Sequence, residues 1–105
     1  MSGAASPDAE SGALEGRVIL VVGAGGGLGS AASVACAAAG ATVILLGRKP
    51  RRLDRVYAQV QQAGPEPLLY PLDLEGATPD DFAELASRVQ AELGRLDGIL
   101  VCAAD

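Results

Sequence analysis

The 105-residue sequence contains no histidine, which excludes several kinds of active site at once. Zinc sites built on histidine, Ser-His-Asp triads and histidine general bases all need that side chain. Cysteine is almost as scarce, since Cys36 and Cys102 lie far apart and follow no Cys-x-x-Cys pattern. We therefore expect neither a metal site nor a redox dithiol, but a reduced cytoplasmic protein with both thiols buried as small hydrophobic groups.

Positive charge is also scarce, because 13 Asp and Glu outnumber 8 Lys and Arg and give a formal net charge of -5. This balance argues against nucleic acids and anionic membranes as partners, since both attract a cationic face. No apolar run approaches the ~20 residues that span a bilayer.

Residues 1–13 are small, polar and acidic, unlike a signal peptide, and we interpret them as a disordered tail before a domain at 14–105.

What the sequence does contain is an alternation of short apolar runs with longer helical segments, which is typical of a parallel α/β sheet. Right-handed crossovers place the first two helices on one face of such a sheet and the third on the other. The predicted fold is a Rossmann-type doubly wound sheet of four strands, in the order 3-2-1-4, with fewer strands than a complete domain. Strands are predicted at 17–22, 42–46, 67–72 and 98–102, and helices at 28–39, about 50–64 and 79–93.

The third predicted helix carries the clearest signals for where it begins and ends. Thr78 can cap it, Pro79 suits its first turn, and Gly94 ends it. Two acidic residues in the first turn complement the positive end of the helix dipole. Its predicted buried stripe consists of Phe82, Leu85, Val89 and Leu93.

Five glycines follow the first predicted strand, in the stretch VVGAGGGLGS at positions 21–30. Glycines between a strand and a helix permit close backbone approach, and the helix start offers unpaired N–H groups to an anion. The strict Gly-x-Gly-x-x-Gly pattern fails at Leu28 and Ser30, and the phosphate-loop pattern lacks its lysine. A glycine-rich turn without a ligand is the competing interpretation. The two spacings that remain are Gly23, Gly27 and Gly29, or Gly23, Gly26 and Gly29.

A basic cluster follows the second predicted strand. NAD-selective sites place an acidic residue at this point to bind the ribose hydroxyls, whereas here Gly47 is followed by Arg48. Positive charge at a helix N-terminus costs about 0.3 to 1 kcal/mol per residue, so the cluster favours an anion. We predict that Arg48 binds the 2'-phosphate of NADP, which makes NAD the less favoured cofactor. The alternative is a solvated helix face partly balanced by Asp54. The cluster consists of Arg48, Lys49, Arg51, Arg52 and Arg55.

Four segments together carry a family resemblance. They are VGAGGGLG at positions 22–29, GATVILLGR at 40–48, DLEG from Asp73 and LDGILVCAA from Leu96. Over about Leu14 to Asp105 the sequence resembles the short-chain dehydrogenase/reductase family, and within it the YciK-like subgroup of bacterial reductases. The first segment matches the family's Gly-x-x-x-Gly-x-Gly spacing, which selects Gly23, Gly27 and Gly29 from the two open patterns.

The resemblance implies a cofactor site in which the selected glycines line the pyrophosphate and Arg48 selects NADP. Asp73 and Leu74 would hold the adenine, although a turn or capping carboxylate is the alternative for Asp73. The family's Asn-Asn-Ala-Gly segment is replaced here by residues 102–105, and its first Thr by Val22. The residues expected to bind the cofactor are Gly23, Gly25, Gly27, Leu28, Gly29, Arg48, Asp73, Leu74 and Ala103.

The family's catalytic Tyr-x-x-x-Lys pair has no counterpart, because Tyr57 is followed four places on by Gln61 and Tyr70 by Leu74. In that pair the lysine lowers the tyrosine pKa for proton exchange with a carbonyl or alcohol. We therefore expect an NADP(H)-binding portion of an oxidoreductase, truncated before its catalytic residues and inactive alone. The alternative is a catalytically silent nucleotide- or partner-binding module. In either case, the exposed edge of the fourth strand could form a homo-oligomer or pair with another chain.

Overall fold

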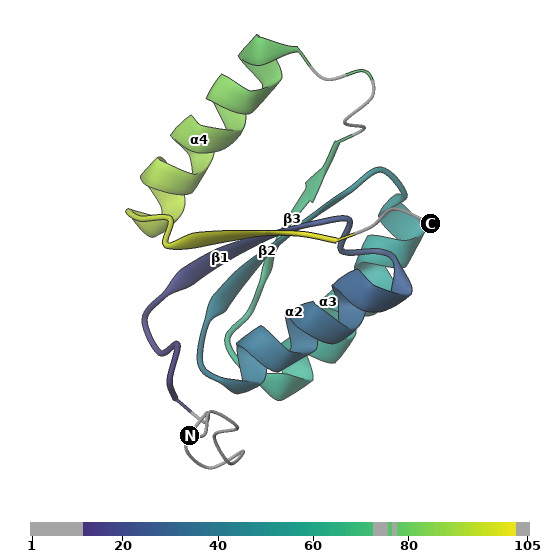
Figure 1. The fold of residues 1–105 in the computed structure, drawn as a ribbon. Helices are drawn as coiled ribbons and strands as arrows, with labels where there is room; N and C mark the ends of the chain where they lie inside the picture. The colour runs from purple at the N-terminus through teal and green to yellow at the C-terminus, as the bar shows by residue number, and fades with distance from the viewer. Residues whose placement is uncertain (1–11, 73–75, 77, 103–105) are drawn as a thin grey trace.

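The computed structural model describes residues 12–72, 76 and 78–102 and shows one parallel sheet with helices on both faces (Figure 1). The strand order is β3-β2-β1-β4, which confirms the predicted α/β topology. Every element begins and ends within one residue of its predicted bounds. The elements are β1 (Val18–Val22), α2 (Gly27–Ala38), β2 (Thr42–Gly47), α3 (Pro50–Ala63), β3 (Leu68–Pro71), α4 (Pro79–Leu93) and β4 (Gly98–Val101).

Helices α2 and α3 cover one face of the sheet and α4 lies on the other, as the crossover rule predicts (Figure 1). Neighbouring side chains of β1 and β2 alternate between the faces, because successive residues of a strand point in opposite directions. Val21, Val43 and Leu45 therefore join the core beneath α2 and α3. Leu20 and Ile44 belong to the core beneath α4.

The core beneath α2 and α3 is tightly closed. Leu53, Val56 and Val60 recur at helical spacing along α3 and are all buried, as their spacing predicts. Small side chains of α2 let its backbone come close to its neighbours, so that a Cβ at Gly64 would overlap the carbonyl oxygen of Ala37. The contact between Gly64 and Ala37 brings the end of α3 close to the end of α2.

Helix α4 is capped as the sequence indicates, but it covers less of the sheet than its pattern suggests. Thr78 forms a capping box with Asp81, and Gly94 ends the helix at a φ of 77°. Leu85 and Val89 are buried against β1 and β2. The predicted burial of Phe82 is wrong, because its side chain is 48% exposed. The start of α4 is the part of the helix farthest from the sheet (Figure 1), and helical spacing cannot reveal that distance.

Strand β4 is held by polar contacts at its start and has little apolar cover. The Asp97 carboxylate accepts a 2.8 Å bond from the Val18 N–H, and the Asp97 N–H donates to the Val18 carbonyl. Arg95 pairs with the same carboxylate and, together with the Val18 bond, lowers the pKa of Asp97. Ile99 and Val101 remain 56% and 78% exposed.

None of the described helices combines the length and the apolar character that a membrane span needs.

Candidate cofactor-binding site

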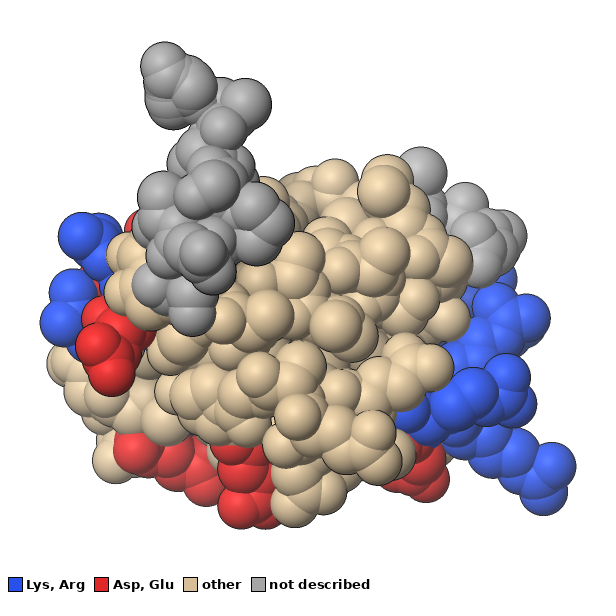
Figure 2. Space-filling view, turned by 90° about the horizontal axis from the view of Figure 1, so that it is seen from below, with Lys and Arg blue, Asp and Glu red and all other residues tan. Residues whose placement is uncertain are grey.

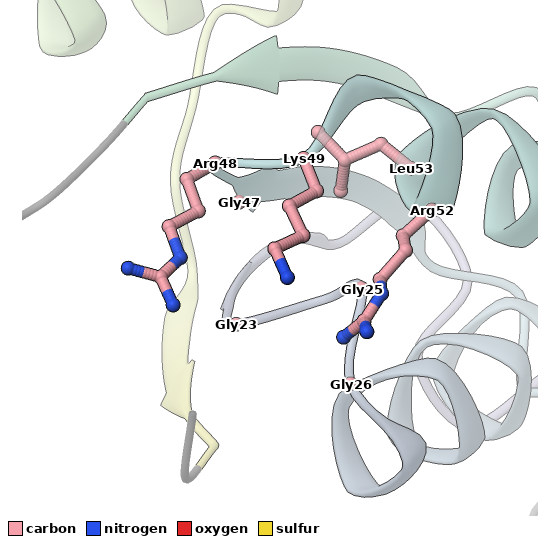
Figure 3. A pocket seen from close by; sticks show the side chains of 8 residues that line it. All are labelled: Gly23, Gly25, Gly26, Gly47, Arg48, Lys49, Arg52 and Leu53. Carbon is pink, nitrogen blue, oxygen red and sulfur yellow. The ribbon is translucent and has the colours of Figure 1, made fainter. Parts of the chain in front are cut away.

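A hollow lies at the carboxyl end of the parallel sheet, between the loop that follows β1 and the turn that joins β2 to α3 (Figure 3). We call residues 23–26 the glycine loop. The N–H groups of Gly23 and Ala24 both donate to the carbonyl of Leu46, which fixes the loop against the end of β2. The hollow is lined by Gly23, Gly25, Gly26, Gly47, Arg48, Lys49, Arg52 and Leu53.

Two of the predicted glycines are required by the protein's own backbone. Gly23 has a φ of 80°, and a Cβ there would lie 2.7 Å from the carbonyl oxygen of Cys102 at the end of β4. A Cβ at Gly29 would overlap the carbonyl oxygen of Gly23. Because these two residues have no side chain, the start of α2 and the end of β4 can both pack closely against the glycine loop.

Gly27 is different, because a Cβ there would meet no described atom within 4 Å. It is the first residue of α2, and the preceding Gly26 has no side chain that could cap the helix. The first N–H groups of a helix have no acceptor within the helix, so they can donate to a bound anion. The adjacent Leu28 is 65% exposed on the same first turn. Among the described residues, Gly27 therefore borders open space beside N–H groups of the first turn of α2 that have no acceptor.

Gly25 and Gly47 allow α3 to approach the glycine loop. A Cβ at Gly25 would lie 3.0 Å from the Cβ of Arg52, and one at Gly47 would lie 3.1 Å from a methyl carbon of Leu53. The first turn of α3 consequently lies against the loop, with Leu53 fully buried below the hollow. This packing explains why a strand-end glycine precedes Arg48.

The charge at the hollow is positive. Arg48, Lys49 and Arg52 line it (Figure 3), and none of its lining residues in the described part of the chain is acidic. The first turn of α3 also contains no acid, and its N-cap has no side-chain hydrogen bond. In Figure 2 the larger of two groups of Lys and Arg side chains lies at one end of the molecule, and a smaller group lies at the opposite end. Cations and a helix N-terminus at one opening attract a phosphate.

The predicted site residues fall into three groups. Gly23, Gly25 and Arg48 line the hollow. Gly27, Leu28 and Gly29 form the first turn of α2 beside it. Asp73, Leu74 and Ala103 lie outside the described residues, although the preceding Leu72 donates its N–H to the carbonyl of Gly47.

Lys49 and Arg52 line the hollow, although the sequence predicts them only as members of a charged cluster and not as site residues. Helix α3 begins at Pro50, and residues three and four apart share one side of a helix. Arg52 and Leu53 therefore follow Lys49 on the side that faces the glycine loop, whereas Arg51 does not line the hollow. This spacing is visible in the sequence.

The thiols do not supply a nucleophile at this opening. Cys102 is buried in the core beneath α2 and α3. Burial, with a smaller effect of Cys102, raises the pKa of Cys36. Within the described residues, no group of three or more possible metal-ligating side chains gathers. The donors at the hollow are suited to binding phosphate.

The sheet order and the glycine loop place the chain among the Rossmann-type α/β folds. The chain belongs to the short-chain dehydrogenase family, whose family model matches residues 17–104. It is 41% identical over 88 residues to the uncharacterized oxidoreductase YciK of Escherichia coli K12, covering 83% of this chain and 35% of that protein.

The chain is also similar to solved structures of short-chain dehydrogenases. A Pseudomonas syringae protein assigned to the short-chain dehydrogenases has 53% identity and a TM-score of 0.82, over 88% of this chain and 38% of that one. A Shigella flexneri 2a protein in complex with NADP has 41% identity and a TM-score of 0.80, over 86% and 38% of the two chains. The present chain thus spans little more than a third of the length of these relatives.

Proposed function

We propose that residues 14–105 form the NADP(H)-binding portion of an oxidoreductase of this family. The observation that carries the proposal is the hollow at the glycine loop, which combines the first N–H groups of α2 with three cations, and whose described lining residues include no acid. The NADP bound to the Shigella flexneri relative supports the choice of cofactor. When bound, the cofactor would supply hydride chemistry, in which its reduced form donates a hydride to a carbonyl and its oxidised form accepts one from an alcohol.

The residues present fit a pyrophosphate group at the start of α2. Gly23 and Gly29 shape the loop, while Gly27 leaves open the space that a phosphate oxygen would enter. Gly25 and Leu28 flank that space in the proposal. The N–H groups at the start of α2 would donate to the phosphate and hold the dinucleotide in one orientation.

The proposed adenosine half lies toward β2. Arg48 would bind the 2'-phosphate with its forked guanidinium, which favours NADP over NAD. We also propose Asp73 and Leu74 as contacts of the adenine, and Ala103 as a contact beyond β4. Both thiols are free, and we propose a cytoplasmic location, where thiols stay reduced.

Titration of the chain with NADPH and with NADH tests the proposal. We expect tighter binding of NADPH, and a loss of about tenfold or more in Arg48→Ala because a charge-assisted hydrogen bond is removed. NADH affinity should change little in that variant. Arg51→Ala is the matched control, since it removes the same charge from an exposed position that does not line the hollow. Equal affinity for both cofactors, unaffected by Arg48→Ala, would overturn the assignment.

We also propose that β4 pairs with a strand from a second copy or from a complementary chain. In the described sheet β4 contacts β1 on one side only, and Ile99, Leu100 and Val101 are all at least 40% exposed. Light scattering coupled to size-exclusion chromatography measures the mass of the particle. We expect a species larger than the monomer that Val101→Lys dissociates, whereas a stable monomer at all concentrations contradicts pairing with a second copy.

A further inference from the structure

Arg88 of α4 contacts the aromatic ring of Tyr70 on β3. The central carbon of its guanidinium group lies 5.5 Å from the centre of the ring, within the range of a cation–π contact. Glu84 and Glu92 lie one helical turn away on either side, yet no ion pair among the described residues involves Arg88. In the described part of the chain, the ring of Tyr70 is therefore the partner of this guanidinium group.

The contact lies on a short strand at one edge of the described sheet. Strand β3 is four residues long and pairs with β2 on one side only. The Tyr70 side chain packs against the core beneath α4, and together with Arg88 it lines a small hollow between β3 and that helix. The packing of Tyr70 beneath α4 is therefore one of the contacts that fix the end of β3.

The end of β3 is joined to the glycine loop through the end of β2. The last two residues of β3 pair in parallel register with Leu46 and Gly47. The next N–H along the chain, that of Leu72, donates to the Gly47 carbonyl at 2.7 Å. The Leu46 carbonyl accepts the first two N–H groups of the glycine loop. The end of β2 is thus bonded to the chain leaving β3 on one side and to the glycine loop on the other.

Gly47 lies where these bonds meet the proposed cofactor site. It lines the hollow at the glycine loop. A Cβ at Gly47 would lie 3.1 Å from a methyl carbon of Leu53 and 3.7 Å from the backbone nitrogen of Gly25, so there is little room for the strand end to move. A displacement of the end of β3 that carries Gly47 with it would change the spacing between the glycine loop and α3. The adenosine half of the proposed site, which lies toward β2, would be affected first.

On the basis of the proposed NADP(H) function, on which this inference rests, we propose that Arg88 is a positioning residue of the cofactor site. By stacking on Tyr70 it holds the end of β3 against Gly47, and the adenosine side of the hollow keeps its binding geometry. Arg88 belongs to α4, on the opposite face of the sheet from α2 and α3, and it does not line the hollow (Figure 1). It acts on the ligand through the strand ends alone.

Adenosine 5'-monophosphate and inorganic pyrophosphate are the probes, because only the first carries the adenosine group. Isothermal titration of the full chain with each probe separates the two halves of the site. We expect Arg88→Ala to lower the affinity for the monophosphate about threefold and that for pyrophosphate less than about 1.5-fold, because one exposed cation–π contact is lost. A substitution that only destabilises the fold would leave the ratio of the two affinities unchanged.

Variants of Tyr70 separate the contact from the charge of Arg88. Tyr70→Leu removes the ring and keeps the charge, so it should weaken monophosphate binding as much as Arg88→Ala does. The double variant should lose no more than either single variant, because both remove the same contact. Tyr70→Phe is the matched control, since it keeps the ring and should bind both probes like the starting protein. Arg88→Lys should fall between, because an ammonium group stacks less well than a guanidinium group.

The possible outcomes distinguish the role of Arg88 from the proposed function. A starting protein that binds neither probe contradicts the cofactor site and the role of Arg88 together. Binding of both probes that Arg88→Ala leaves unchanged, or weakens equally, overturns the positioning role alone. Unchanged monophosphate binding in Tyr70→Leu would assign the effect of Arg88→Ala to charge and also overturn it. Circular dichroism verifies the fold of each variant, and if Tyr70→Leu does not fold, starting-protein affinity in Arg88→Lys is the result that assigns the effect to charge.

Discussion

The two faces of the sheet differ in how completely they are covered. Under α2 and α3, Leu53 and Val60 are fully buried. On the face that carries α4, Phe82 is 48% exposed and Val101 78%. The closed face is also the one on which the glycine loop and the start of α3 meet (Figure 1). The proposed cofactor site is therefore built where the chain's own packing is strongest.

This difference follows from the distance between partners along the sequence. The elements that form the hollow, from β1 to the first turn of α3, are consecutive, so each one packs against its neighbour in the chain. Strand β4 instead pairs with β1 across a separation of almost 80 residues and is tied at its start by Asp97. The core beneath α2 and α3 is closed by consecutive elements, whereas β4 is tied at its start by the polar contacts of Asp97.

The largest expected effect comes from truncating the closed core. Leu53→Ala should lower the free energy of unfolding by about 2 to 5 kcal/mol, because it leaves a cavity beneath α3. Phe82→Ala removes a larger side chain, yet we expect a loss below about 1 kcal/mol, since that side chain is half exposed. Urea denaturation of both variants, followed by circular dichroism, measures the two values. Equal losses would show that α4 is packed as firmly as α3.

Much of this architecture could be predicted from the sequence. Buried strands of a parallel sheet are continuous apolar runs, and the helices carry ordinary start and stop residues such as Pro79 and Gly94. These local signals predict the element bounds, and the rule of right-handed crossovers in a doubly wound sheet predicts the order of the strands. The exposure of Phe82 was not predicted, because periodicity identifies the apolar side of a helix and not the length over which that side meets the sheet.

The site was only partly predictable for a similar reason. The glycines and Arg48 stand out as a motif, and the structure places them around one hollow or beside it. Arg52 and Gly47 belong to the same hollow through packing between α3 and the loop, which is a tertiary contact. Asp73, Leu74 and Ala103 lie outside the described residues, so their roles stay predictions.

A pair of glycine variants sharpens the comparison within the closed region itself. Gly29→Ala should cost about 1 to 3 kcal/mol of stability, because its methyl group would overlap the Gly23 carbonyl and force the start of α2 away from the loop. Gly27→Ala should stay within about 0.5 kcal/mol of the starting protein, since its methyl group enters open space. Although Gly27→Ala should keep its stability, it should bind NADPH more weakly, because its methyl group enters the space in which we propose the phosphate lies. Thermal melts and NADPH titrations of both variants test this, and unchanged NADPH affinity in Gly27→Ala would place the phosphate elsewhere.

The smallest expected effect concerns the polar tie between β4 and β1. Arg95 and the Val18 N–H lower the pKa of Asp97 in the folded protein, so this carboxylate stabilises the fold while it is ionised. The contribution is complete above the unfolded pKa of about 3.9 and is lost as the pH falls through the lower folded value. Asp97→Asn should therefore lower the melting temperature near neutral pH by less than Leu53→Ala does, and the difference from the starting protein should shrink as the pH falls below 4. The matched control is Asp54→Asn, which removes the same charge from α3. Melting curves from pH 7 to pH 2 measure both differences, and a pH-independent effect of Asp97→Asn would mean that packing, not charge, holds β4 in place.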